Sequence, residues 1–339
     1  GGVFAAIVGT LELLLPAERA RVLGVIINKF RGDASLLAPG IAEIEARYAL
    51  PVLGVIPYLK LHLPEEDSLG LARKQAAAAA GGLRIGVLRL ERISNFTDFD
   101  PLEREAGVEL VYLDTPEQLE GLDLLILPGT KSTVADLDSL RQQGFGRAIH
   151  DYHAAGGWIA GICGGFQMLG KRISDPHGVE SSREEVEGLG LLDVETVMLE
   201  FKQTHEVDAS LLPAAADTAL AGAEGLSGYE IHMGETTLGP LARPLLRLVR
   251  RSVRGVDLLD GAVSSDGRVW GTYLHGLFDP PRARQALLAA LRRRRGLAAP
   301  AAAPLATLEA ELDRLADHLE AHLDLAPILA RLGAPKGGR

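Results

Sequence analysis

Cysteine is nearly absent from this chain, which has one, Cys163, among 339 residues. A single cysteine can form no internal disulfide, which is typical of proteins in a reducing compartment, so we expect a cytoplasmic protein. Long apolar runs are absent as well. With no stretch of about eighteen apolar residues and no signal-peptide pattern at the N-terminus, the sequence predicts neither a membrane span nor export.

Positive charge is scarce, since 35 Lys and Arg stand against 45 Asp and Glu, giving a net charge of -10. Nucleic-acid binding needs a basic face, so this balance argues against a nucleic-acid partner. The exception is the run 292–295 of four arginines, which has no interleaved aromatic residue and which we expect to form a solvated helix end. A hydrophobic content of 47% is ordinary for a globular protein with a core.

The length predicts two domains. Short β-branched runs alternate with amphipathic stretches, which indicates parallel sheets covered by helices on both faces. An alanine-rich stretch ending in two glycines and a later Ala/Pro-rich stretch are expected linkers. The predicted divisions are a first α/β domain at 1–78, a linker at 79–83, a second α/β domain at 84–291, an Arg/Ala/Pro linker at 292–304 and terminal helices at 305–339.

The periodicity predicts the elements of both domains. Helices are expected at 3–15, 36–48, 133–143, 145–155 and within 305–332. Strands are expected at 22–27, 51–57, 83–88, 108–113, 122–127 and 157–162, and, in a more strand-rich part after Gly188, at 191–197, 228–233 and 269–274.

Cys163 lies between a predicted strand and a glycine-flanked helix, in Gly-Ile-Cys-Gly-Gly-Phe-Gln. This arrangement is typical of a nucleophile elbow, in which small neighbours permit a sharp turn and the sulfur stands at the carboxyl edge of the sheet. The N-terminus of the following helix favours the thiolate. The alternative is a buried, unreactive cysteine, which is the commoner fate of a lone one.

A cysteine nucleophile needs a base, and His275 ends the strand-like run Trp-Gly-Thr-Tyr-Leu-His. Because parallel sheets place their active sites at the carboxyl edge, we expect His275 near Cys163. Glu230 and His232 share one face of another strand and are the rival partners of Cys163.

Two backbone segments are candidates for an oxyanion hole: the N–H of Gly164, directly after the nucleophile, and the turn at Gly129 that closes a neighbouring strand. A plain strand-to-helix connection is the alternative for the turn. Gln167 follows Cys163 by one helical turn and is a candidate for holding a polar group of the substrate, with an ordinary helix-surface glutamine as the alternative.

Two other patterns are not sites. Gly129-Thr130-Lys131-Ser132 resembles the end of a phosphate-binding loop, but no Gly-x-x-x-x-Gly-Lys-Ser/Thr occurs in the chain. His318 and His322 are four residues apart, yet the acidic residue of a metalloprotease helix is not in its position, so we predict no metal site.

Seven sequence segments together resemble a known family. They are 161–167 (GICGGFQ), 92–100 (RISNFTDFD), 127–133 (LPGTKST), 228–232 (GYEIH), 271–276 (GTYLHG), 27–33 (INKFRGD) and 63–68 (LPEEDS). The first, with the later histidine, resembles class I glutamine amidotransferases. The full combination, which covers nearly the whole chain, resembles the cobyric acid synthase family.

This resemblance implies the C-terminal half of a dethiobiotin-synthetase-like P-loop domain, followed by a flavodoxin-like class I amidotransferase domain. It implies an ATP- and glutamine-dependent ligase, with Mg, that amidates carboxylates of a corrinoid, adenosylcobyrinic acid a,c-diamide, in cobalamin biosynthesis. Cys163 and His275 would be the catalytic pair, Gly129 and Gly164 the oxyanion hole, and Asn28 a residue that approaches adenine.

The sequence departs from the family pattern at two places. Most class I amidotransferases have His-x-Glu at the base, whereas this chain has His275-Gly276-Leu277. We therefore predict a Cys–His dyad that another group orients. The phosphate-binding loop is expected upstream of Gly1, so we expect a piece of a longer protein that binds no cofactor tightly and carries out glutaminase chemistry alone.

Three alternatives remain open at this point. Cobyrinic acid a,c-diamide synthase shares the architecture, although the 92–100 segment favours the cobyric acid synthase family. A cell-wall amidotransferase subunit would share the second domain. A non-catalytic scaffold that keeps the fold is the alternative from a different functional class.

Overall fold

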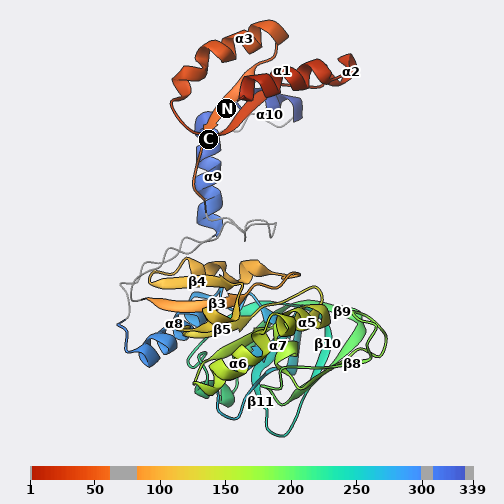
Figure 1. The fold of residues 1–339 in the computed structure, drawn as a ribbon. Helices are drawn as coiled ribbons and strands as arrows, with labels where there is room; N and C mark the ends of the chain where they lie inside the picture. The colour runs from red at the N-terminus through yellow and green to blue at the C-terminus, as the bar shows by residue number, and fades with distance from the viewer. Residues whose placement is uncertain (1, 62–81, 299–307, 333–339) are drawn as a thin grey trace. The chain divides into compact units, whose positions relative to one another are not determined.

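The computed structural model describes residues 2–61, 82–298 and 308–332. The chain divides into two compact units (Figure 1). The first unit combines Gly1–Leu63 with Ala306–Arg339, and the second is Pro64–Leu305. Among the described residues, no helix is both long and apolar enough to cross a bilayer.

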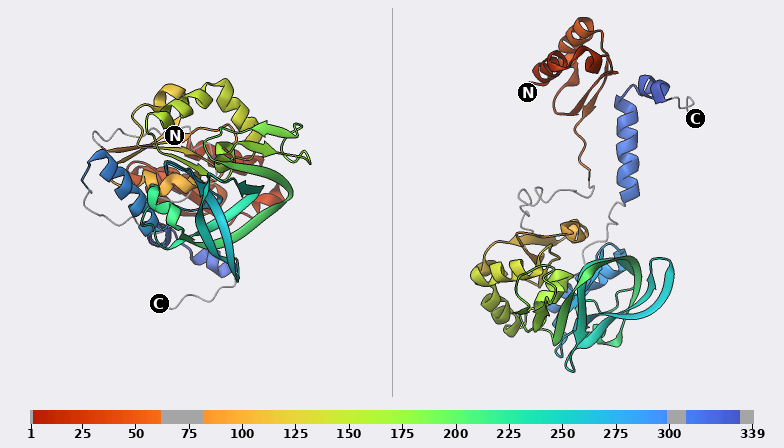
Figure 2. Two further views of the ribbon diagram at one scale, coloured as in Figure 1. Left: turned by 90° about the horizontal axis from the view of Figure 1, so that it is seen from below. Right: turned by 90° about the vertical axis from the view of Figure 1, so that its right-hand side faces the viewer.

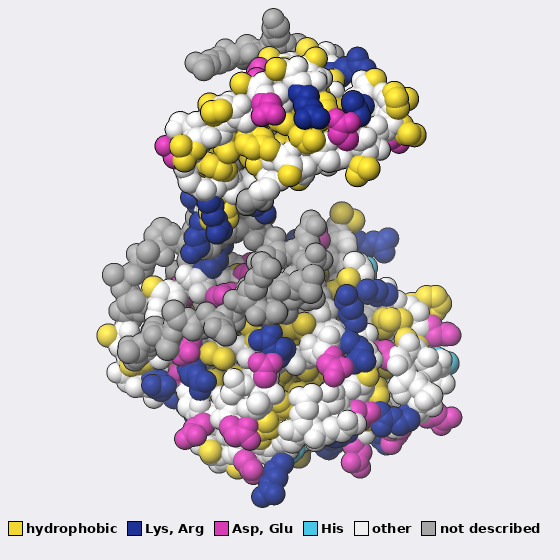
Figure 3. All heavy atoms as spheres, turned by 45° about the horizontal axis from the view of Figure 1, so that its top comes forward, with side chains coloured by type: hydrophobic (Ala, Val, Ile, Leu, Met, Phe, Trp, Pro, Cys, Tyr) yellow, Lys and Arg dark blue, Asp and Glu magenta, His cyan; other side chains and the backbone are white. Residues whose placement is uncertain are grey.

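The first unit contains a short parallel sheet of β1 and β2 with helices around it. Its elements are α1 (Val3–Leu13), α2 (Pro16–Arg19), β1 (Val25–Phe30), η1 (Ala34–Leu37), α3 (Ala38–Tyr48), β2 (Val52–Pro57), α9 (Leu308–His322) and α10 (Ala326–Leu332). Leu13, Leu15 and Leu36 are each more than half exposed. Figure 3 accordingly shows apolar side chains on the surface of this unit.

The C-terminal helices belong to this first unit because α9 ends against β2. Nε2 of His318 donates to the carbonyl of Pro57 over 2.9 Å, and Leu323, the residue after the helix, forms an antiparallel bridge with Gly54. A β-carbon on Gly54 would lie 2.1 Å from the carbonyl oxygen of His322, so only glycine permits this approach. The residues we expected to form a separate C-terminal region thus complete the N-terminal unit.

The second unit is built on one twelve-stranded sheet. Its parallel part has the order β13-β6-β5-β3-β4, and its helices lie on both faces (Figures 1 and 2). The elements of this part are β3 (Leu83–Leu88), η3 (Phe96–Phe99), α4 (Asp100–Glu103), β4 (Val108–Leu113), η4 (Pro116–Leu119), β5 (Leu124–Leu127), α5 (Thr133–Gln142), α6 (Phe145–Ala154), β6 (Ile159–Ile162), α7 (Gly164–Leu169), β13 (Val269–Thr272) and α8 (Pro281–Arg295).

Antiparallel strands extend the sheet beyond β13 in the order β12-β11-β9-β10-β14. They are β9 (Val194–Leu211), β10 (Leu226–Leu238), β11 (Arg243–Arg251), β12 (Arg254–Val263) and β14 (Leu274–His275), with β7 (Arg172–Ser174) and β8 (Glu185–Glu187) attached to β9 and the turn η5 (Pro213–Asp217) between strands. Since β13 pairs with β12 while β14, one residue later, pairs with β10, the antiparallel strands curl back on themselves.

The observed elements agree with the predicted ones in type, and β3 and β4 agree in both bounds. The predicted start of the linker at residue 292 is wrong, because helix α8 continues through Arg295. Arg295 forms an ion pair with buried Asp123 over 3.1 Å, and Arg294 packs over the ring of Trp158. The last three arginines of the run are exposed, so the solvated helix end that we expected at 292–295 is confirmed. In the predicted linker 79–83, residues 79–81 lie outside the described residues.

Candidate active site

Cys163 forms a strained turn between β6 and α7. Its backbone has φ 52° and ψ -112°, a conformation that a residue with a side chain adopts only when its surroundings impose it. A β-carbon on Gly165 would lie 2.0 Å from the carbonyl oxygen of Leu127, so only glycine lets α7 begin this close to β5. The turn brings Sγ to 3.6 Å from the carbonyl oxygen of Ile231, and the cysteine is 8% exposed.

His275 lies at the end of β14 and is completely buried. Its Nδ1 is 2.6 Å from Oδ2 of Asp98, and the other oxygen of Asp98 accepts the N–H of Gly276 over 3.1 Å. A carboxylate only accepts hydrogen bonds, so Nδ1 carries a hydrogen and donates it. In the neutral ring Nε2 is therefore the basic nitrogen.

The register of the sheet brings Cys163 and His275 together. Ile162 of β6 pairs with Thr272 of β13, and the N–H of Cys163 donates to the carbonyl of Thr272 over 2.8 Å. Both residues thus follow the carboxyl ends of neighbouring parallel strands, as we expected from their positions. Nε2 of His275 has no hydrogen-bond partner of ordinary geometry among the described residues. Cys163 is nevertheless close enough to raise the pKa of His275.

The site favours the protonated form of His275. Burial lowers the pKa of His275, but hydrogen bonding and charge attraction from Asp98 and from the Cys163 thiolate raise it from 6.5 to about 10. The arrangement therefore supports an imidazolium at neutral pH, next to the Asp98 carboxylate and the sulfur of Cys163. A thiolate beside an imidazolium is a nucleophile with a proton donor already in place.

Tyr229 covers one face of the imidazole. The two rings are stacked with centroids 5.2 Å apart and planes 13° apart. The hydroxyl of Tyr229 accepts a hydrogen bond of 2.6 Å from the side-chain amide of Asn95, a residue in the left-handed backbone region, with φ 52°. The segment that begins at Asn95 therefore positions the imidazole in two ways. Asp98 binds the edge of the ring, and Asn95 holds Tyr229 against the face of the ring.

The two predicted oxyanion segments lie beside the cysteine. Gly129 follows β5, and a β-carbon there would be 3.1 Å from Cε1 of His275. A β-carbon on Gly164 would be 3.3 Å from the backbone nitrogen of Thr130, so the two segments adjoin each other. The two segments thus lie next to each other and to Cys163, and their role as an oxyanion hole stays a prediction.

Gln167 differs from our expectation in its surroundings. It is 2% exposed; its side-chain oxygen accepts the hydroxyl of Thr133 over 2.9 Å, and its nitrogen donates to the hydroxyl of Tyr273 over 3.2 Å. The amide lies inside the core, where a buried polar group needs hydrogen-bond partners. Its two bonds connect the start of α5 to Tyr273, which lies between β13 and β14. The predicted contact of Gln167 with substrate stays a prediction.

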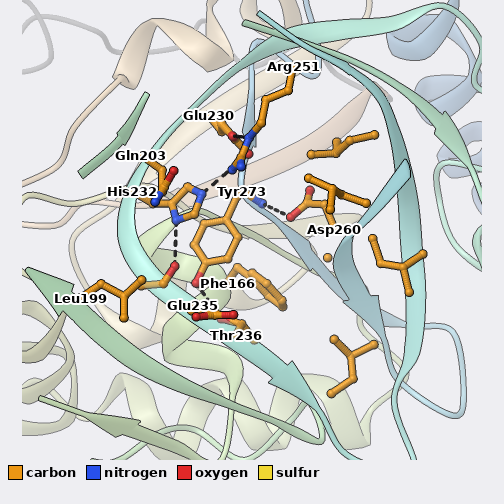
Figure 4. A pocket seen from close by; sticks show the side chains of 16 residues that line it. Phe166, Leu199, Gln203, Glu230, His232, Glu235, Thr236, Arg251, Asp260 and Tyr273 are labelled. Atoms are coloured by element: carbon orange, nitrogen blue, oxygen red, sulfur yellow. Dashed lines mark hydrogen bonds and ion pairs between the residues drawn. The ribbon is translucent and has the colours of Figure 1, made fainter. Parts of the chain in front are cut away.

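The rival pair Glu230 and His232 lies on the face of β10 away from the cysteine. Neighbouring residues of a strand point to opposite faces, and Tyr229 on this strand faces His275. Glu230 and His232 instead point into a separate pocket (Figure 4). They are not partners of Cys163.

Asn28 belongs to β1 in the first unit, where it is exposed and its Oδ1 accepts the N–H of Lys29 over 2.8 Å. Its predicted approach to adenine stays a prediction. Within the described residues, no cluster of three His, Cys, Asp or Glu side chains is arranged to hold a metal ion, and this includes the neighbourhood of His318 and His322.

Sequence reasoning missed Asp98 and Tyr229. Both occur in segments that carry the family resemblance, but Asp98 is 177 residues from His275 in the chain and lies in the short turn η3. No local pattern distinguishes it from the neighbouring Asp100.

The family model described as the CobB/CobQ-like glutamine amidotransferase domain matches residues 84–283. The chain belongs to this family. A second model, the CobQ/CobB/MinD/ParA nucleotide binding domain, matches residues 1–68 of the chain. The predicted fold class is confirmed by these two matches.

Curated relatives are similar over most of the chain. Cobyric acid synthases of Syntrophobacter fumaroxidans, Photorhabdus laumondii and Sorangium cellulosum are 48%, 51% and 49% identical to it over 87%, 88% and 88% of its length. The matched regions span 58%, 58% and 60% of those proteins. The amidotransferase chain therefore covers somewhat more than half the length of the relatives that it matches, and the similarity confirms the resemblance seen in its motifs.

Proposed function

We propose that Cys163, His275 and Asp98 hydrolyse glutamine and release ammonia. The observation that supports this most strongly is the 2.6 Å hydrogen bond from Nδ1 of His275 to Asp98, which leaves Nε2 as the nitrogen that can take up and release a proton. The expected dyad is thus extended to a triad whose acid comes from η3. In this role Asp98 fixes the tautomer of His275 and stabilises its charge.

In the first half of the reaction the Cys163 thiolate attacks the carbonyl carbon of the glutamine side chain. The negative charge that develops on the carbonyl oxygen is stabilised by backbone N–H groups at Gly164 and the Gly129 turn. His275 then donates its Nε2 proton to the amide nitrogen, the carbon–nitrogen bond breaks, and ammonia leaves. The product on the enzyme is a glutamyl thioester.

In the second half water resolves the thioester. Neutral His275 takes a proton from the water through Nε2 while the oxygen bonds to the thioester carbon. The carbon–sulfur bond then breaks, glutamate leaves, and the thiolate and imidazolium are restored. Asp98 keeps its hydrogen bond to Nδ1 throughout and does not exchange a proton.

The test is ammonia release from glutamine by the purified chain and by its Cys163→Ala variant. We expect release by the wild type and none above background by the variant. Because Cys163 is the only thiol, a glutamine-like diazoketone should add one equivalent of label to the wild type and none to the variant. Equal ammonia release by both proteins contradicts the proposal, and an unlabelled wild type favours a non-catalytic scaffold.

For a protein of the full length of these relatives, we propose ATP- and glutamine-dependent amidation of corrin carboxylates, with adenosylcobyrinic acid a,c-diamide as substrate. The names of the relatives and the nucleotide-binding match over residues 1–68 support this proposal. ATP would activate the carboxylate and ammonia would displace the activating group. Asn28 is the residue of the first unit that the family resemblance predicts to approach ATP, and the described residues contain no metal cluster, so we derive no step through ATP or Mg.

Substrate competition tests this second proposal. The full-length protein with ATP and glutamine should amidate adenosylcobyrinic acid a,c-diamide, as followed by mass increments of the corrinoid. Faster amidation of cobyrinic acid itself would favour a cobyrinic acid a,c-diamide synthase. Amidation of a cell-wall precursor would favour the remaining alternative.

A further inference from the structure

A turn at residues 129–131 follows β5 and pairs with residues 92–94. Two hydrogen bonds of 2.9 Å join these segments, from the N–H of Ser94 to the carbonyl of Gly129 and from the N–H of Lys131 to the carbonyl of Arg92. Thr130 lies between the two bonds and forms an antiparallel bridge with Ile93. In a bridge of this kind the N–H of the middle residue points away from the neighbouring segment. The N–H of Thr130 is therefore directed away from residues 92–94.

The backbone nitrogen of Thr130 lies next to the nucleophile elbow. A β-carbon on Gly164 would be 3.3 Å from this nitrogen, and Gly164 directly follows Cys163. Within the turn, the N–H of Thr130 is thus the donor that the backbone leaves available for the carbonyl oxygen of glutamine. Its direction depends on how the turn is fixed to the rest of the unit.

A buried carboxylate on α5 binds both segments of the bridge. Asp136 is 1% exposed, and its Oδ2 accepts the hydroxyl hydrogen of Thr130. The same carboxylate accepts the backbone N–H of Arg92 over 3.3 Å and the guanidinium of Arg92 over 3.0 Å. The carbonyl oxygen of Arg92, at 3.2 Å, is the more distant acceptor for the Thr130 hydroxyl. The oxygen of that hydroxyl accepts the N–H of Ser132 over 3.1 Å, so it is bonded on both sides.

The bonds of Asp136 do not serve its own helix. Helix α5 begins at Thr133, whereas all three of these hydrogen bonds come from Thr130 and Arg92, which precede it in the chain. Burying a carboxylate is costly unless hydrogen bonds and an opposite charge compensate it. Here the compensation comes entirely from the two segments of the bridge, so the carboxylate fixes these segments to each other.

We infer that Asp136 is a positioning residue for the oxyanion hole. By binding the Thr130 hydroxyl and Arg92 together, it directs the N–H of Thr130 toward the charge that develops on the carbonyl oxygen of glutamine. This inference rests on the proposed glutaminase function. Asp136 takes no part in proton transfer and acts only through Thr130.

The first measurement is kcat and KM for ammonia release from glutamine. Thr130→Val keeps the backbone N–H and the pair of Asp136 with Arg92 but loses the hydroxyl. We expect its kcat to fall by about tenfold or more with KM changed less than threefold, because complete loss of an oxyanion donor costs about 10²- to 10³-fold in kcat and a displaced donor costs less. Asp136→Asn should have the same effect. Thr130→Ser, which restores the hydroxyl, should return kcat to within about threefold of wild type.

The second measurement separates the oxyanion hole from the nucleophile. Iodoacetamide alkylates Cys163 by displacing iodide from a tetrahedral carbon, so no oxyanion forms in this reaction. Its rate depends on the thiolate and should stay within about twofold of wild type in Thr130→Val and Asp136→Asn. A merely structural change at the elbow would instead slow alkylation and glutamine hydrolysis together.

Asp138→Asn is the matched control, because Asp138 also lies on α5 and also pairs with an arginine, Arg183. It should keep both kcat and KM. Thermal midpoints establish that each variant is folded at the assay temperature, and if Asp136→Asn does not fold, Thr130→Val decides the question alone.

Three results would overturn the inference. They are an unchanged kcat in Thr130→Val, a Thr130→Ser variant as slow as Thr130→Val, and a loss of alkylation rate equal to the loss of kcat. In each of these cases the wild-type chain still releases ammonia, so the proposed function stands. A wild-type chain that releases no ammonia overturns the proposed function and this inference with it.

Discussion

Tyr229 lies nearly parallel to the imidazole of His275, with ring planes 13° apart, while Asn95 holds the hydroxyl of Tyr229 from the opposite end. The stack encloses a histidine that is completely buried, although the proposed reaction requires it to exchange protons with glutamine and water. An aromatic face also attracts a cation, so the contact favours the imidazolium. Tyr229 is therefore a positioning residue for the proposed base.

Removing the ring of Tyr229 should reduce glutaminase activity. We expect Tyr229→Leu to lower kcat by about tenfold, because the imidazole then loses the surface that fixes its orientation. Tyr229→Phe keeps the stack and loses only the bond to Asn95, so its kcat should stay within about threefold of wild type. Steady-state kinetics on both variants checks this, and equal losses would show that the hydroxyl rather than the stack matters.

Asp98→Asn should lower kcat on the order of 10³-fold and move the alkaline limb of the pH profile to lower pH. The charge of Asp98 is a main cause of the raised pKa of His275, about 10, whereas burial alone lowers it. Without this carboxylate the imidazolium loses its proton at lower pH. The measurement is kcat for ammonia release against pH, and an unmoved alkaline limb would contradict the assignment.

The pair of His275 and Asp98 should make the free energy of unfolding depend on pH. The folded-state pKa of His275 is raised above its unfolded value of 6.5, so its stabilising effect is complete below that pH and is lost as the pH rises toward 10. The difference in free energy of unfolding between wild type and Asp98→Asn should therefore shrink across this interval. Urea unfolding at several pH values measures it, and a difference that grows with pH would be inconsistent with an Asp98–imidazolium pair.

Gly165→Ala should destabilise the amidotransferase unit by about 2 kcal/mol or more, because its methyl group would lie 2.0 Å from the carbonyl oxygen of Leu127. Gly146→Ala is the matched control. It lies in α6 with its nearest neighbour at an ordinary 3.6 Å, so alanine should stabilise that helix by up to about 1 kcal/mol. Thermal unfolding of both variants tests the pair, and equal effects would exclude the tight approach of α7 to β5.

Gln167→Met separates a packing role from substrate binding. Loss of the bonds to Thr133 and Tyr273 should cost about 1–3 kcal/mol of stability. If Gln167 acts only within the core, KM for glutamine should change less than twofold at a temperature where the variant is folded. A large rise in KM with little loss of stability would support the substrate contact that we predicted from the spacing to Cys163.

The sequence predicts the parts of this site that depend on strand ends. Cys163 and His275 each follow a recognisable apolar run, and the carboxyl ends of parallel strands meet at one edge, so their proximity follows from pattern alone. Asp98 does not follow a strand. It reaches His275 only through the tertiary path of η3, which no periodicity encodes.

The curled part of the second unit was also beyond sequence reasoning. Strands were expected after Gly188, but β9, at 18 residues, is far longer than the run at 191–197, because polar residues on its open face interrupt the apolar pattern. The face to which His232 points depends on the register of β10 with β9 and β14. That register is set by packing, so the pocket could not be predicted.

The pairing of α9 with β2 makes the amidotransferase unit an insertion in the first unit rather than its successor. A protein shortened after Arg295 would keep every residue named in the glutaminase proposal. It would nevertheless lose the hydrogen bond between Pro57 and His318 of α9 and the bridge between Gly54 and Leu323. Removal of residues 306–339 would therefore harm the residues at the beginning of this chain first.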